Sequence, residues 1–332
     1  MRRMIRSLLL PAIALVGLGC DQSFNPKEEF EERYILQCFV GMQYPGGGAP
    51  QVTAVLAKTY DVNGVDAAVN TTDPAIAGAE VMLTVNQTPF YLLGAQRPNP
   101  DTGRYHTQQW VYTRSISNLR PDAAVSITAK LPSGKILTAH TTVPGQRNFV
   151  SNYEFGSGVT SPINLEPGKP NWIISWENND DIEVHLFVSR LTISYTKMVG
   201  GNEITGSVAV PSRYISSQGG TIPYYPSISP QKQCVFEFSA LDSAMVHIAS
   251  GDPEKIKFGV HTARFELIEY DMPLSKYFAS INGSLDQYSI RTDESVYSNV
   301  NGGIGILGSY MIRWVDFMFD ERYVQRFGYR YR

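Results

Sequence analysis

Apolar residues recur at every second position in most segments after residue 33, and this pattern narrows the possible folds more than any other feature. Alternation turns one face of an extended segment toward the core and the other toward solvent, as in a half-buried β-strand. The clearest examples are RYILQCFV, QVTAVLAKTY, AEVMLTVN, AVSITAK and KILTAHTTV. We therefore expect a protein built mainly of β-strands.

Turn residues separate these strands. The Asn63-Gly64 dipeptide is typical of a tight hairpin, DTG at 101–103 of a short loop, and LPSGK joins two of the clearest strands. Several short strands at such spacing predict an immunoglobulin-like β-sandwich over residues 34–145.

A second β-rich domain is predicted over residues 171–332. Residues 146–170 contain the prolines, glycines and serines of a connection between domains. The later strands are NWIISWE, EVHLFVSRLTISYTK, QCVFEFSA and KFGVHTARFELIEY, with residues 200–233 as an insertion and MPLSKYFASI as a single short helix. The predicted fold is all-β: two β-sandwich domains, the second with one short helix, and no parallel α/β sheet.

Residues 1–19 have the organisation of a secretory signal peptide. Arg2, Arg3 and Arg6 precede an apolar run that is shorter than the roughly 18 to 20 residues needed to cross a bilayer. The run ends in VGLGC, which resembles a lipobox. Cys20 is then the expected lipidation site, with a diacylglycerol on its sulfur and an acylated (palmitate-type) new N-terminus, and residues 20–33 would form a polar tether. The alternative is an ordinary secretory signal with a cysteine nearby.

Charge argues against nucleic acid as a partner. The formal net charge of −3 becomes −6 when the three arginines of the signal peptide are removed. Such a balance offers no basic surface for phosphates. The KEEFEE segment of the tether resembles a signal that directs lipoproteins to the outer face of the outer membrane, and a solvated linker is the alternative.

The segment NVNGGIGILGSY contains a G-x-G-x-x-G pattern at Gly303, Gly305 and Gly308. A dinucleotide site needs a preceding strand, a following helix of three or more turns and a later acidic residue. The segment after Gly308 reads as strand and turn, so no dinucleotide and no other cofactor is predicted. The glycines are instead expected to take positive φ angles or to allow close backbone packing.

No catalytic motif is found, and the protein is predicted not to be an enzyme. G-x-S-x-G, H-E-x-x-H and Walker patterns do not occur. The S-x-x-K pattern from Ser194 to Lys197 lies in a predicted strand, which would separate the two groups. No metal site is predicted, since the acids of WENNDDIE lack calcium-loop spacing and the histidines occur singly, at His106, His140, His185, His247 and His261.

Four aromatic residues are candidates for contacting a ligand. Trp172 and Trp176 share one face of a strand, where sandwich core is the favoured interpretation and ligand contact the alternative. Tyr224 and Tyr225 lie in a proline-bounded loop, where burial is less easily arranged.

Two further patterns leave alternatives open. Cys38 and Cys234 lie on the apolar faces of different predicted strands, either as two separate thiols or as a disulfide. The final RFGYRYR alternates aromatic and cationic residues, which fits an edge strand protected by arginines or a contact with lipid headgroups or a partner barrel.

The order of motifs along the chain resembles a family of bacterial outer-membrane lipoproteins catalogued as domain of unknown function 4249. The matching segments are the lipobox, APQVTAVLAKT, GAEVMLTVN, VSITAKLPSGKILTAHTTVP and YSNVNGGIGILGSY. The resemblance implies this architecture and a lipid-anchored location at the outer membrane, with exposure at the cell surface an open possibility. It implies no established activity. Members are often encoded near TonB-dependent transporters, which implies an accessory role beside such a barrel.

We therefore expect a non-enzymatic outer-membrane lipoprotein that assists a TonB-dependent transporter in nutrient uptake or binds a glycan or peptide. One alternative is a surface hydrolase of glycans or peptides that draws its carboxylates from distant loops. The other is an adhesin or structural protein of the cell envelope.

Overall fold

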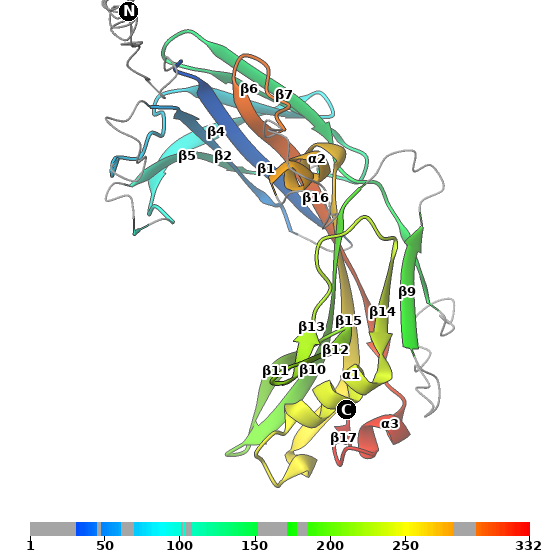
Figure 1. Ribbon diagram of the computed structural model, residues 1–332. Helices are drawn as coiled ribbons and strands as arrows, with labels where there is room; N and C mark the ends of the chain where they lie inside the picture. The colour runs from blue at the N-terminus through cyan, green and yellow to red at the C-terminus, as the bar shows by residue number, and fades with distance from the viewer. Residues whose placement is uncertain are drawn as a thin grey trace, which may run out of the picture. The chain divides into compact units, whose positions relative to one another are not determined.

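The computed structural model describes residues 31–44, 48–60, 70–100, 102–103, 108–117, 119–151, 171–177, 185–281 and 297–332 (Figure 1). Arg33–Arg332 forms one compact unit. Cys20, the signal peptide, the Asn63-Gly64 turn, His106 and most of WENNDDIE lie outside the described residues. Within the described ranges no helix is long and apolar enough to span a membrane.

The all-β, sandwich-like prediction is confirmed. The elements in chain order are β1 (Tyr34–Tyr44), β2 (Gln51–Lys58), β3 (Glu80–Val85), β4 (Thr88–Arg97), β5 (Gln109–Ser115), β6 (Ala124–Lys130), β7 (Ile136–Thr142), β8 (Asn148–Ser151), β9 (Asn171–Glu177), β10 (Phe187–Val199), β11 (Asn202–Val210), β12 (Arg213–Ser217), β13 (Gly220–Tyr224), β14 (Gln233–Glu237), α1 (Phe238–Ile248), the 3-10 helix η2 (Lys255–Lys257), β15 (Phe258–Tyr270), α2 (Met272–Ile281), β16 (Ile304–Met318), α3 (Glu321–Gln325) and β17 (Arg330–Tyr331).

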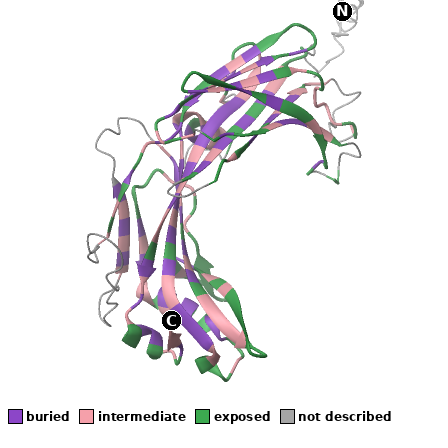
Figure 2. Ribbon diagram, turned by 180° about the vertical axis from the view of Figure 1, so that it is seen from behind, coloured by how far each residue is buried: buried purple, intermediate pink, exposed green. Residues whose placement is uncertain are grey.

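The first seven strands enclose one hydrophobic core. They are joined in the order β1-β2-β5-β4-β3-β6-β7, and β4 changes partner along its length, from β3 at residues 88–92 to β5 at residues 93–97. This change lets two layers face each other. Buried and exposed residues alternate along the strands, as the period-two pattern predicts (Figure 2). We call the buried apolar side chains of residues 36–143, together with Val300, Leu307 and Met311, the first core.

A second core lies among the later elements. Its buried apolar side chains come from β9, β10, β11, β14, β15, the end of β16, α1 and the segment Phe319–Tyr329. The predicted strand QCVFEFSA ends early, because α1 begins at Phe238. Helix α1 buries Ala240, Leu241, Ala244 and Ile248, a helical spacing that a strand would place on both faces.

Strand β16 belongs to both cores. It pairs in parallel with β1 from Ile304 to Arg313 and antiparallel with β15 from Tyr310 to Met318. A single sheet path therefore runs from β11 at one end to β7 at the other. The predicted division of the chain into residues 34–145 and 171–332 gave no account of this strand, which joins the two regions.

The predicted short helix is present as α2, which packs on β16 (Figure 1). Helices α1 and α3 are additions to the prediction. The predicted insertion at residues 200–233 is also ordered: β11 extends the main sheet beside β10, and β12 and β13 form a separate hairpin.

The glycines of the G-x-G-x-x-G segment allow close packing of the backbone and of helix α2. Gly305 has a φ of +124°, and a Cβ there would overlap the Leu36 carbonyl oxygen. A Cβ at Gly308 would overlap the side chain of Leu274 in α2. Because Gly305 and Gly308 lie within strand β16, which continues to Met318, the helix that a dinucleotide site requires is missing at this position.

Cys38 and Cys234 are both free and buried, so the two-thiol interpretation holds. Burial raises the pKa of Cys38 to about 12 and raises that of Cys234 as well.

At the C-terminus the aromatic side chains pack toward the second core, and Tyr329 donates a hydrogen bond to the Met245 carbonyl. Arg326 and Arg332 are exposed, whereas Arg330 is half-buried. Arg326 pairs with Asp242 and Arg332 with Glu203, which fits the protected-edge interpretation.

Candidate functional site

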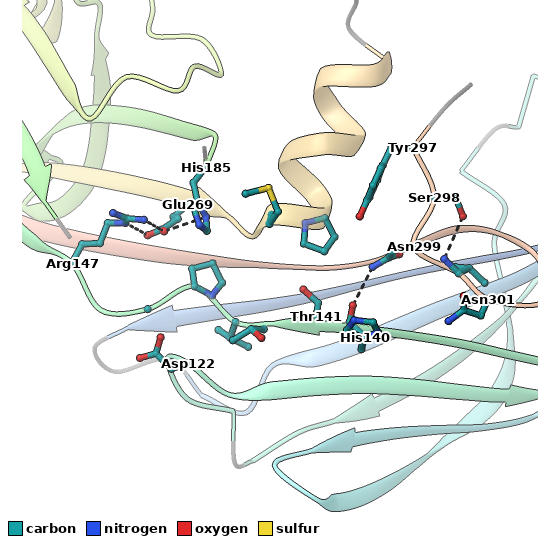
Figure 3. Close-up of a pocket in the computed structure, with 17 residues that line it drawn as sticks. Asp122, His140, Thr141, Arg147, His185, Glu269, Tyr297, Ser298, Asn299 and Asn301 are labelled. Carbon is teal, nitrogen blue, oxygen red and sulfur yellow. Dashed lines mark hydrogen bonds and ion pairs between the residues drawn. The ribbon is translucent and has the colours of Figure 1, made fainter. Parts of the chain in front are cut away.

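A pocket of about 650 Å³ lies where β7, β15, α2 and the segment before β16 meet (Figure 3). We call it the polar pocket. Its lining comprises Asp122, His140, Thr141, Thr142, Val143, Pro144, Gly145, Arg147, His185, Glu269, Met272, Pro273, Tyr297, Ser298, Asn299, Val300 and Asn301. Residues far apart in sequence meet here because β16 brings the end of the chain beside β7 through the Thr138–Asn301 bridge.

One wall contains a buried ion pair. The Arg147 guanidinium donates to both Glu269 oxygens, with Nε–Oε2 and Nη2–Oε1 distances of 2.6 and 2.5 Å, and both side chains are 1% exposed. Arg313 donates to the Arg147 carbonyl, and His185 Nδ1 lies 3.7 Å from Glu269. Such a bidentate, desolvated pair is rigid. Glu269 is therefore committed to Arg147.

Asp271 lies behind the pocket and joins three elements. It accepts hydrogen bonds from Thr141 of β7, from the backbone N–H and hydroxyl of Ser309 in β16, and from the Leu274 N–H at 2.8 Å. The last of these caps the N-terminus of α2. Burial raises the pKa of Asp271, and the hydrogen bonds oppose that rise. Asp271 does not line the pocket, but its hydrogen bonds hold β7, β16 and α2 together around it.

Asp271→Asn is expected to destabilise the fold by about 1–3 kcal/mol, because its amide NH₂ would face a backbone N–H donor. The folded pKa of Asp271 exceeds the reference value of 3.8, so the folded state holds the proton of this carboxyl more tightly than the unfolded state does. The stabilisation from the protonated carboxyl is therefore complete below pH 3.8 and is lost as the pH rises through the folded pKa. The advantage of the wild type over the variant should therefore shrink with rising pH. Urea unfolding from about pH 3 to pH 7 measures it, and a growing advantage would contradict the assignment.

Several polar side chains around the pocket remain open to a ligand. Asp122, His140, Tyr297 and Asn301 line it, and within the described part of the chain no side-chain hydrogen bond or ion pair engages the Asp122 carboxylate, the His140 ring, the Tyr297 hydroxyl or the Asn301 amide. Asn299 differs, because its amide bonds the His140 carbonyl and both the N–H and carbonyl of Leu307. The groups without a partner can bind a ligand, and the hydrogen-bonded groups such as Asn299 keep the pocket wall in position.

The four aromatic candidates from the sequence are not together in this pocket. Trp172 and Trp176 are 0% and 2% exposed in the second core, which agrees with the core interpretation and removes them from the surface. Tyr224 and Tyr225 are 39% and 49% exposed. Two of the four, Trp176 and Tyr224, line a smaller pocket of about 330 Å³.

In this smaller pocket, Arg213 lies over the Tyr224 ring at 5.1 Å, because the two residues are paired across the β12–β13 hairpin. The Trp176 indole N–H has no hydrogen-bond partner among the described residues. Trp176 and Tyr224 thus point to a second, smaller candidate site beside the hairpin.

The residues that line the polar pocket carried no sequence signal of a site. His140 is exposed on its strand, and nothing in its local sequence showed that Tyr297 and Asn301 lie across from it. Only the parallel β1–β16 pairing, between segments about 270 residues apart, aligns them.

Other candidate chemistries find no support in the described residues. Among them no group of three or more His, Cys, Asp or Glu side chains could hold a metal ion. Ser194 and Lys197 both lie on β10, and the Lys197 ammonium pairs with Asp252 at 2.9 Å. The strand geometry expected for this S-x-x-K pattern is confirmed.

Comparison with known proteins does not assign the chain to a family. No protein-family model matches the chain, and no curated protein shows significant similarity to it. The residues of the two pockets and the N-terminal sequence are therefore the features that indicate a function.

Proposed function

We propose that this protein is a lipid-anchored outer-membrane lipoprotein that acts as a non-enzymatic binding module, accessory to a TonB-dependent β-barrel uptake transporter. The observation that carries the binding role is the polar pocket. The buried carboxylate of Glu269 is paired with Arg147. The Asp122 carboxylate and several neutral polar groups face the open space of the pocket. The lipobox-like VGLGC and the family resemblance support the membrane address and the transporter.

Binding explains the pocket better than hydrolysis does. A hydrolytic pair needs two carboxyl groups that can each exchange a proton or attack the substrate. Asp122 and Glu269 are the carboxyl residues among the described lining residues, and Arg147 holds Glu269 through both oxygens. The surface hydrolase, with acids from other loops, remains the alternative to be tested, as does an envelope adhesin.

The anchor is tested by labelling. Cells given a palmitate analogue should incorporate it into the wild-type protein, and Cys20→Ser should lose the label completely and release the protein from the membrane fraction. The physical reason is that each buried methylene contributes about 0.8 kcal/mol to anchoring. Cys38→Ser is the matched control and should remain labelled, because that thiol is buried in the first core. Equal labelling of Cys20→Ser would contradict the proposal.

The partner is tested by purification of the tagged protein from gently solubilised outer membranes, followed by mass spectrometry. A stoichiometric β-barrel transporter is the expected result. Recovery of the protein alone, under conditions in which a known barrel complex survives, would refute the accessory role and favour the adhesin or hydrolase alternative.

A further inference from the structure

We infer that the polar pocket binds an uncharged polyhydroxylated ligand, a neutral sugar of one or two rings. The inference rests on the proposed binding role and names the class of ligand. The volume of about 650 Å³ is within the range of pockets that enclose small molecules and has room for a disaccharide.

Charge within the pocket disfavours an anionic ligand. The one cationic side chain of the lining, Arg147, is neutralised by Glu269. Asp122 then supplies an uncompensated negative charge. A phosphate or carboxylate would find no unpaired lysine or arginine among the lining residues, since Lys276, at 5.9 Å over the Tyr297 ring, is not one of them. A neutral ligand avoids the repulsion from Asp122.

The open groups match hydroxyls. A sugar hydroxyl both donates and accepts, and the pocket offers an acceptor carboxylate at Asp122 with donor and acceptor groups at Tyr297, Asn301 and His140. Figure 3 shows Tyr297, His140 and Asn301 grouped at one end and Asp122 at the other. A ligand that engages all four must carry several hydroxyls spread over its length.

Apolar atoms complete the lining. Val143, Pro144 and Pro273 lie among the polar groups and can contact the C–H faces of a sugar ring. A single amine could pair with Asp122 alone, but it would leave the polar groups at the other end without partners.

Asp122 permits a sharp test. Its φ is +61°, a conformation that asparagine also adopts readily, so Asp122→Asn removes the charge and keeps the turn. Gly145→Ala offers a second route to the same group, because a Cβ there would lie 2.6 Å from Asp122 Oδ1 and displace the carboxylate.

The experiment is calorimetric titration of the detergent-purified full chain with glucose, galactose, N-acetylglucosamine, maltose, cellobiose, glucuronate and glucosamine. At least one neutral sugar should bind, with its uronate at least about 10-fold weaker. Asp122→Asn and Gly145→Ala should each weaken binding by about 10-fold, and Tyr297→Phe by about 3-fold, since a hydrogen bond to a charged group is the stronger. Tyr224→Ala in the smaller pocket is the matched control and should bind normally.

Three results would overturn the inference: no neutral sugar binds the folded protein, the uronate or the amine binds best, or Tyr224→Ala abolishes binding while Asp122→Asn does not. Transporter recovery is independent of these titrations. A barrel partner without sugar binding refutes the ligand class alone, and sugar binding without a barrel refutes the accessory role alone.

Discussion

Gly305→Ala is expected to destabilise the protein by about 3–5 kcal/mol, a very large effect for one added methyl group. Two costs add. The φ of +124° is strained for any residue with a side chain, and the new Cβ would overlap the Leu36 carbonyl oxygen of β1. The obstacle is backbone within the parallel β1–β16 pairing, so no side-chain rotation can relieve it. Because β16 joins the two cores, the loss should reduce the stability of both.

The matched control is Gly134→Ala, in the turn between β6 and β7. Gly134 has a φ of +84°, but a Cβ there would meet nothing within 4 Å. This variant reports the strain alone and should cost about 1 kcal/mol. Urea unfolding followed by tryptophan fluorescence, with the wild type alongside, measures both. Equal effects in the two variants would show that β16 does not approach β1 as closely as described.

Glu269→Gln is expected to cost about 3–5 kcal/mol, because it leaves the Arg147 guanidinium charged and buried without its anion. Both side chains are 1% exposed, so water cannot replace the lost partner. Replacing both residues, as Arg147→Met with Glu269→Leu, should recover much of this loss, since the double variant buries no unpaired charge. Thermal and urea unfolding of the two single variants and the double variant provide the cycle that isolates the pair.

The chain offers a matched surface pair for comparison. Arg264 and Asp316 form the same bidentate geometry, at 2.7 and 2.8 Å, but with exposures of 50% and 44%. Asp316→Asn should therefore cost less than about 1 kcal/mol. If both neutralising variants had the same effect, burial of the Arg147–Glu269 pair would not be the cause of its importance.

Local patterns were sufficient for most elements. The YILQCFV, AVSITAK and MPLSKYFASI segments are β1, β6 and α2, because side-chain periodicity reports which face of an element is buried. Helix α1 was misread at its start: VFEFSA alternates well enough for a strand, and the helical spacing becomes clear only from Ala240 onward. The boundary between β14 and α1 depends on whether the strand or the helix pattern dominates these few residues.

The sequence by itself determined the strand-dominated fold and the packing role of the late glycines, since each follows from residue type and near neighbours. The structure decided between two separate thiols and a disulfide, which the sequence had left open. Only the tertiary structure decided the polar pocket. Its groups come from β7, β15 and the segment before β16, and they meet because β16 pairs with β1 across the length of the chain. Long-range strand pairing leaves no periodic trace in either partner, which is why His140, Tyr297 and Asn301 could not be grouped from the sequence.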